Sequence, residues 1–272
     1  MDIYKEVTDR IIRQMEQGII PWQKPWVASS AAVSHATGKP YSFLNQMLLG
    51  RSGEFVTFKQ CQQEGGSVRK GEKAHMVIFW KWSKIRNEET GDEKEIPFLR
   101  YYNVFHIDQC DGLTAKYAEG LPQTANADEN AEQIICDYCE RTGVKLIQQA
   151  SDNAFYQPSA DSITIPLLAQ FTETAEYYST TFHEMVHSTG HKSRLDRLAK
   201  TAFFGSEAYS KEELIAEIGA AALVNHVGLE TSKSFRNSAA YVQSWLQVLK
   251  SDKRFIVSAA GKAEKAVQMI LE

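Results

Sequence analysis

Apolar residues at the start of the chain recur every three or four positions, with charged residues between them. The set consists of Ile3, Val7, Ile11, Ile12 and Met15. This period is that of one helix face, so the pattern predicts an amphipathic helix. Gly18 and Pro21 follow directly and predict that the helix ends in a turn.

Three later runs are rich in β-branched and aromatic residues and predict strands. They are FVTF at 55–58, MVIFWKW at 76–82 and FLRYYNVFHI at 98–107. Because a charged turn separates the last two runs, we expect them to form a long antiparallel hairpin. Residues 118–129 show no apolar period, which is typical of a linker.

Helical patterns dominate the rest of the chain. Helices are expected at 131–141, 174–188, 211–227, 239–249 and 259–271, and short strands at 144–149 and 162–166. The sequence therefore predicts an α+β fold of two domains: residues 1–117 with the antiparallel hairpin, a linker at 118–129, and residues 130–272 with a small sheet ahead of a helical bundle.

Composition excludes several classes of protein. The chain has 272 residues, 43% of them hydrophobic, which is ordinary for a globular protein. It contains no stretch that approaches the roughly 18 apolar residues of a membrane span, and its N-terminus lacks a signal-peptide pattern. Four cysteines are too few for a disulfide scaffold, so we expect the protein to work in a reducing cytoplasm. Because no membrane span is expected, we also expect no membrane partner. Two of the cysteines, Cys136 and Cys139, fall in an expected helix and are interpreted as small apolar side chains.

Charge is distributed unevenly along the chain. Residues 1–110 carry a net charge of plus 2, and residues 111–272 a net charge of minus 6. Within the first part, residues 56–86 hold seven basic and two acidic side chains, a net charge of plus 5. A local basic patch on an acidic protein indicates a polyanionic partner.

The strongest chemical signal is HEMVH at 183–187. Two histidines four residues apart on a helix lie on the same face, so His183 and His187 are expected to bind one zinc ion. Glu184 then lies beside the metal-bound water and is the expected catalytic proton acceptor. This is the chemistry of peptide-bond hydrolysis. The alternative is a solvated helix face with two ordinary histidines.

A second carboxylate-bearing helix, KEELIAEIGAA, supplies the expected third ligand. Glu213 suits that role, and Glu217 is either the alternative ligand or a hydrogen-bond partner of a ligating imidazole. Tyr209, His191 and His226 are unranked candidates for stabilising an oxyanion. Mn or another divalent metal fits a His-His-Glu site as well as zinc.

Basic and aromatic residues of the first part are candidates for binding single-stranded nucleic acid, which needs cations for phosphates and rings for base stacking. The expected DNA contacts are Lys24, Arg69, Lys70, Lys73, Trp80, Lys81 and Trp82. Strand alternation places Trp80 and Trp82 on one face and Lys81 on the other, and one face must be core. The alternative is that these rings are core residues and the charges belong to a solvated loop.

Motifs across almost the whole chain resemble the ArdC antirestriction family. In the first part they are GIIPWQKPW, GKPYSFLNQMLL, GGSVRKGEKAHMVIFWKW and NVFHIDQCDGL, which resemble a single-stranded-DNA-binding domain that also begins TraC-type plasmid primases. In the second part DSITIP, YYSTTFHEMVHSTGHKSRL, YSKEELIAEIGAA and SAAYVQSWL resemble a zincin-like metallopeptidase domain. Ser188 departs from the pattern, because an aromatic residue often follows the second histidine.

The resemblance implies a bacterial, plasmid- or mobile-element-borne protein of the cytoplasm. Such a protein would bind single-stranded DNA, and duplex DNA more weakly, and protect incoming DNA from host restriction during conjugation. His183, His187 and Glu213 carry over as metal ligands, and Glu184 as the catalytic glutamate. The alternative is a DNA-recruited zinc metallopeptidase that hydrolyses a protein substrate or a component of a restriction system. A third hypothesis is that the metal only stabilises the second domain.

Overall fold

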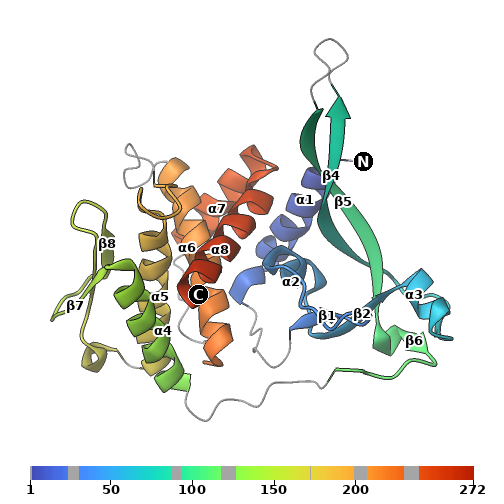
Figure 1. Cartoon of the computed structure of the whole chain (residues 1–272), viewed down its shortest axis with the longest axis horizontal. Coiled ribbons are helices and arrows are strands. Elements are labelled where there is room, and N and C mark those ends of the chain that lie inside the picture. The colour runs from blue at the N-terminus through green and yellow to red at the C-terminus, as the bar shows by residue number, and fades with distance from the viewer. Residues whose placement is uncertain are drawn as a thin grey trace.

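The computed structural model describes residues 2–23, 31–86, 93–117, 127–171, 173–198, 207–229 and 239–272. Lys24, the side chain of Trp82 and residues 118–126 of the expected linker lie outside the described residues. Figure 1 shows the N-terminal elements and the long hairpin on one side of the molecule and the C-terminal helices on the other.

The first helix, α1 (Ile3–Glu16), follows the apolar period of the sequence. Asp2 caps it, because its carboxylate accepts a hydrogen bond of 3.2 Å from the backbone N–H of Lys5. The buried residues of the helix include Val7, Ile11 and Met15, as the spacing predicts. A short 3₁₀ turn, η1 (Pro21–Gln23), follows.

A four-stranded sheet in the order β1-β2-β5-β4 forms the centre of the N-terminal part. Its strands are β1 (Ala32–Ser34), β2 (Gly53–Thr57), β4 (His75–Arg86) and β5 (Glu93–His106). The antiparallel pairing of β4 with β5 confirms the expected hairpin, in a register that sets Trp80 opposite Leu99. Helix α2 (Phe43–Leu49) lies against β4, where the Asn45 amide bonds the backbone N–H and C=O of Ile78, each at 2.8 Å.

Strand β2 ends one residue earlier than the apolar run suggests. Thr57 caps helix α3 (Phe58–Gln63): its hydroxyl accepts from the N–H of Gln60, and the Gln60 side chain accepts from the N–H of Thr57. Beyond α3, the short strands β3 (Ser67–Val68) and β6 (Cys110–Asp111) pair, with η3 (Ile107–Gln109) just before β6.

The C-terminal part joins a small sheet to a helical bundle. Helix α4 (Ala127–Thr142) precedes a three-stranded sheet of β7 (Lys145–Gln148), β9 (Ser162–Ile165) and β8 (Phe155–Gln157), in that order. Then follow η4 (Leu168–Gln170), α5 (Thr174–Thr189), α6 (Glu207–Val227), α7 (Ala239–Ser251) and α8 (Phe255–Leu271). The sequence analysis missed β8, whose three residues are too few for a clear period.

The largest hydrophobic core cluster of the described residues runs from α1 through η1 and α2 to the C-terminal helices, and two smaller clusters lie in the N-terminal part. Trp22 packs edge-on against Trp245, with ring centroids 5.6 Å apart. The hydroxyl of Thr8 donates a hydrogen bond of 2.6 Å to the carbonyl oxygen of Lys253, which ties α1 to the turn between α7 and α8. The expected domain bounds stay a prediction, and the apolar packing is continuous across them.

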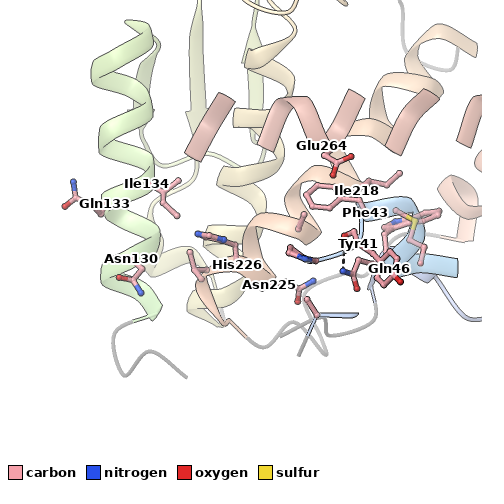
Figure 2. A pocket seen from close by; sticks show the side chains of 16 residues that line it. Tyr41, Phe43, Gln46, Asn130, Gln133, Ile134, Ile218, Asn225, His226 and Glu264 are labelled. Carbon is pink, nitrogen blue, oxygen red and sulfur yellow. Dashed lines mark hydrogen bonds between the residues drawn. The ribbon is translucent and has the colours of Figure 1, made fainter. Parts of the chain in front are cut away.

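A cavity of about 700 Å³ lies where these parts meet (Figure 2). Tyr41 and Gln46 line it from the N-terminal part, and His226 and Glu264 from α6 and α8. Burial lowers the pKa of His226 and raises the pKa of Glu264.

All four cysteines are free. Cys139 is partly buried against the core, as expected, whereas the expectation is wrong for Cys136, which is exposed. Burial raises the pKa of the Cys139 thiol to about 11, which makes it a poor nucleophile.

Along the described residues, no helix combines the length and apolarity needed to cross a bilayer.

Helices α5 and α6 pack closely because α6 has a glycine at their contact. A Cβ atom on Gly219 would lie 2.8 Å from Cγ2 of Val186, closer than real Cβ contacts allow. Val186 itself is fully buried. The absence of a side chain at position 219 therefore sets the distance between the two helices.

Gly219→Ala is expected to lower the free energy of unfolding by about 1–3 kcal/mol, because the added methyl group overpacks the α5–α6 contact. Gly261→Ala in α8 is the matched control, since nothing lies within 4 Å of a Cβ at that position. There, the better helix propensity of alanine should raise stability by about 0.5–1 kcal/mol. Urea unfolding followed by circular dichroism measures both changes. Equal effects of the two substitutions would contradict the close-packing argument.

Candidate metal centre

Helices α5 and α6 bring three expected ligands together. His183 and His187 lie one turn apart on α5, and Glu213 faces them from α6. Three fully buried side chains anchor α5: Phe182 and Met185 lie away from the histidines, and Val186 packs against Gly219 of α6. The apolar face fixes the rotation of the helix, and the histidines therefore point toward α6.

The donor atoms lie close together. Nε2 of His183 is 3.1 Å from Nε2 of His187, and the Glu213 carboxylate oxygens are 3.5 and 3.4 Å from these two nitrogens. Ligands bonded to a tetrahedral zinc ion at about 2.0–2.1 Å are about 3.3–3.4 Å apart. The donor set and its spacing therefore fit a divalent metal ion with an open fourth position.

A second carboxylate faces the outer nitrogen of each imidazole. Oε1 of Glu217 is 3.6 Å from Nδ1 of His183, and Oε1 of Glu212 is 3.2 Å from Nδ1 of His187. A carboxylate at Nδ1 holds the proton there and leaves Nε2 for a metal. Of the two carboxylates weighed for the third ligand, only Glu213 approaches both Nε2 atoms.

In the metal-free site, the surrounding charges favour the protonated form of both histidines. Burial disfavours the charged imidazoles, but the surrounding carboxylates outweigh burial and raise the pKa of His183, and the pKa of His187 to about 10. Burial also opposes ionisation of Glu212 and Glu213, yet the histidines hold the pKa of both carboxyl groups below the usual range. A cation that binds at the Nε2 atoms must therefore displace protons.

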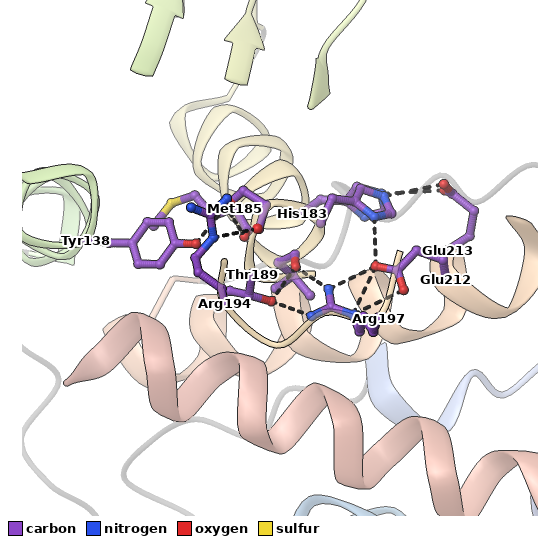
Figure 3. A network of polar contacts seen from close by, with 11 residues as sticks. Tyr138, His183, Met185, Thr189, Arg194, Arg197, Glu212 and Glu213 are labelled. Atoms are coloured by element: carbon purple, nitrogen blue, oxygen red, sulfur yellow. Dashed lines mark hydrogen bonds and ion pairs between the residues drawn. The ribbon is translucent and has the colours of Figure 1, made fainter. Parts of the chain in front are cut away.

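Arg197, which sequence reasoning missed, holds Glu212 in place (Figure 3). Its guanidinium donates to Glu212 at 2.9–3.2 Å and to the Thr189 hydroxyl at 2.6 Å, and it also bonds the Val186 carbonyl. Gly190 lets the chain fold back this tightly, because a Cβ there would lie 3.0 Å from Cγ of Arg197. No spacing rule connects Arg197 with Glu212, so only the fold identifies the pair.

A second arginine fixes the other side of the same helix end. Arg194 pairs with both carboxylate oxygens of Asp161, at 2.5 and 3.0 Å, and its Nε donates to the Ser188 carbonyl at 2.8 Å. Ser188 is fully buried, and its hydroxyl lies 2.7 Å from that of Tyr138 in α4. Figure 3 shows Tyr138 on the side of α5 away from His183, so the departure at Ser188 falls on the α4 contact.

Glu184 is largely buried beside the histidines, and its carboxylate forms no hydrogen bond with the described residues. Its negative charge is one of the influences that raise the pKa of both histidines.

Tyr209 lies on α6 one turn before Glu213, on the same helix face. His191 bonds Ser193, with Nδ1 2.7 Å from the hydroxyl, and His226 lines the cavity of Figure 2.

The expected DNA contacts are scattered over the N-terminal part. Arg69 is paired with Glu72 and Asp111 and bonds the Asp108 carbonyl. Lys70, Lys73 and Lys81 are exposed. Trp80 is 48% exposed, and its ring centroid lies 6.5 Å from that of Tyr4 in α1.

Two family models cover most of the chain. Residues 1–105 match the N-terminal domain of anti-restriction factor ArdC, and residues 129–262 match a zincin-like metallopeptidase. The chain is also similar to the antirestriction ArdC protein of plasmid R388, in its metal-free crystal structure, with 40% identity, 99% coverage of this chain, 97% coverage of that chain and a TM-score of 0.80. The chain belongs to the ArdC antirestriction family.

Other relatives extend this result. The Mn(II)-bound crystal structure of R388 ArdC matches this ArdC-family chain with 39% identity, 99% coverage of this chain, 97% coverage of that chain and a TM-score of 0.80. A DNA primase TraC of Escherichia coli is 37% identical over 98% of the chain. The chain spans only 27% of the length of that primase. A zincin-like domain is a divalent-metal domain, which agrees with the donor set on α5 and α6.

Glu213→Gln is expected to reduce metal affinity more than either neighbouring substitution, because Glu213 is the carboxylate that groups with both histidines among the described residues. Glu217→Gln and Glu212→Gln should each cost about 10–100-fold, the usual effect of losing a partner that orients a ligand. Isothermal titration with Zn²⁺ and Mn²⁺ measures all three, with Glu140→Gln, an exposed carboxylate of α4, as the control. A larger loss for Glu217→Gln would make Glu217 the ligand.

Metal affinity is expected to rise with pH between about 6 and 9. The pKa of His187 in the metal-free site is raised to about 10, so the imidazole is protonated throughout this range and each bound ion must release that proton. The logarithm of the association constant should gain about one unit per pH unit for each proton released. Titrations in buffers of different ionisation enthalpy count the protons, and a flat profile would contradict the protonated metal-free site.

Proposed function

We propose that this protein binds single-stranded DNA in preference to duplex DNA, and that it protects incoming DNA from restriction during transfer of a plasmid or mobile element in the bacterial cytoplasm. The similarity to R388 ArdC over nearly the full length of both chains carries this proposal. The basic window at 56–86 supports a polyanionic partner, and the similarity to DNA primases agrees with it.

The proposal includes one divalent metal ion held by His183, His187 and Glu213. The two-histidine, one-carboxylate donor set on a zincin-like domain supports zinc, and the Mn(II)-bound relative supports manganese as an alternative. A divalent ion held by these donors would supply Lewis-acid chemistry, which polarises a carbonyl group and activates water.

The neighbouring residues have distinct roles in this proposal. Glu184 accepts a proton from water or passes it to a leaving group, because its buried carboxylate is not engaged by the described residues. Glu212 and Glu217 keep the imidazoles oriented. Tyr209 offers a hydroxyl donor to a developing oxyanion on the Glu213 face of α6.

The second candidate function is a DNA-recruited metallopeptidase that hydrolyses a protein substrate, for example a component of a restriction system. The buried Glu184 next to two ligand-type histidines favours it, because a site that only stabilised the fold would not need that carboxylate. Both functions use the same metal centre, so a substitution that spares the metal separates them.

Glu184→Ala should leave metal content and DNA affinity unchanged and abolish any peptide hydrolysis. Transfer of unmodified plasmid DNA into a restricting host measures protection, and fluorescence anisotropy measures binding to single-stranded and duplex DNA. Protection that survives Glu184→Ala supports DNA protection without proteolysis. Protection that is lost while DNA binding persists favours the peptidase.

The wild-type protein provides the decisive control. Absence of both protection and salt-sensitive single-strand binding would contradict the proposed function. A large fall in melting temperature on chelation, without any hydrolysis by the wild-type protein, would instead support a metal that only stabilises the fold.

A further inference from the structure

The long hairpin presents one face that is unusual for a soluble protein. In the register of β4 and β5, Phe79 lies opposite Arg100 and Lys81 lies opposite Phe98, and Tyr102 follows on the same face. Aromatic and basic residues therefore alternate across the two strands. The described positions of this face carry no carboxylate.

Two aromatic rings of this face stack face to face, and a base can stack only on the outer ring face that this contact leaves open. Phe79 and Tyr102 stack in parallel, with centroids 4.3 Å apart and planes 4° apart. Tyr102 is 54% exposed and Phe98 is 38% exposed. A soluble protein seldom leaves neighbouring large rings in water unless they meet a partner.

The cations of this face are available for a ligand. Lys81 and Arg100 are exposed, and neither forms an ion pair with the described residues. In contrast, Arg69, which the sequence also suggested, is already paired with Glu72 and Asp111. Binding of a nucleic acid single strand requires cations near its phosphates and aromatic rings near its bases. The exposed cations and aromatic rings of this face supply both.

The opposite face of the hairpin supplies residues to the main core, although Trp80 and Tyr101 on it are 48% and 41% exposed. Ile78 and Leu99 are buried in the main core, and Trp80 rests near Tyr4 of α1. The Arg254 guanidinium lies 5.2 Å from the Tyr4 ring centroid, so this contact continues to the start of α8. Trp80 therefore contacts α1 with part of its ring, and its role as an expected stacking residue stays a prediction.

We propose that the face formed by Phe79, Lys81, Phe98, Arg100 and Tyr102 binds single-stranded DNA, with bases stacked on the rings and phosphates held by the two cations. This inference rests on the proposed function and assigns its DNA-binding surface. Rings can stack only on bases whose faces are open, so this surface selects single strands over duplex. Strand addition by a protein is disfavoured, because Asn45 occupies the backbone groups of Ile78 on the edge strand β4.

Two adjacent tyrosines provide a matched test. Tyr102→Ala removes a ring from the proposed surface, and Tyr101→Ala removes one from the opposite face, where Tyr101 is 41% exposed. With a fluorescein-labelled oligo(dT) and the full chain, Tyr102→Ala should weaken binding about 5- to 150-fold, the range for a lost base stack. Tyr101→Ala should bind like the wild type, and Tyr102→Phe should retain affinity because it keeps the ring.

The cations are tested through salt. Lys81→Gln and Arg100→Gln should each reduce the slope of log affinity against log salt by about 0.7, the value for one phosphate contact on a single strand. Thermal melting of each variant verifies that the hairpin folds. Unchanged slopes in both folded variants would overturn the role of the cations.

The possible results distinguish a failure of the proposed DNA-binding function from a failure of the proposed DNA-binding surface. If the wild type does not bind oligo(dT), the proposed function itself fails. If the wild type binds and Tyr102→Ala binds equally well, while Tyr101→Ala or Trp80→Ala loses affinity, the DNA-binding function stands and this surface is overturned. Light scattering that shows a dimer disrupted by Tyr102→Ala, with DNA affinity intact, would assign the face to self-association instead.

Discussion

The close contact of α5 with α6 is the constraint on which the metal centre depends. Gly219 lets the helices approach until Val186 fills the space between them. At that separation Glu213 reaches the Nε2 atoms of both histidines of α5. A wider spacing would leave the carboxylate too far from the imidazoles to share a metal ion, so helix packing determines the chemistry.

The same contact concentrates charge in a buried space. Carboxylates and imidazoles are individually costly to bury, and the two histidines, Glu212 and Glu213 are tolerated at this position because each has a partner of opposite charge. Glu212 is held by Arg197 and also faces His187. The network therefore keeps the donor side chains in place before a metal binds, which reduces the ordering that binding requires.

The hydrophobic core that the N-terminal elements share with the C-terminal helices also holds the hairpin in place. The Trp22–Trp245 contact and the bond from Thr8 to Lys253 join the N-terminal elements to the C-terminal helices. Burial of Ile78 and Leu99 then commits one face of β4 and β5 to the core. On the other face Val77 and Val104 belong to a second, smaller core cluster, whereas Phe98 and Tyr102 are exposed.

Local patterns determined much of this protein. The helical period from Ile3 to Met15, the alternating strands of the hairpin and the spacing of His183 and His187 depend on neighbours within one or two turns, and the sequence displays them directly. Tertiary structure decided the rest. Arg197 meets Glu212, Glu213 lies near Nε2 and Glu217 near Nδ1 of His183, and Phe79 stacks on Tyr102. Each of these contacts depends on packing between segments whose separation in sequence carries no periodic signal.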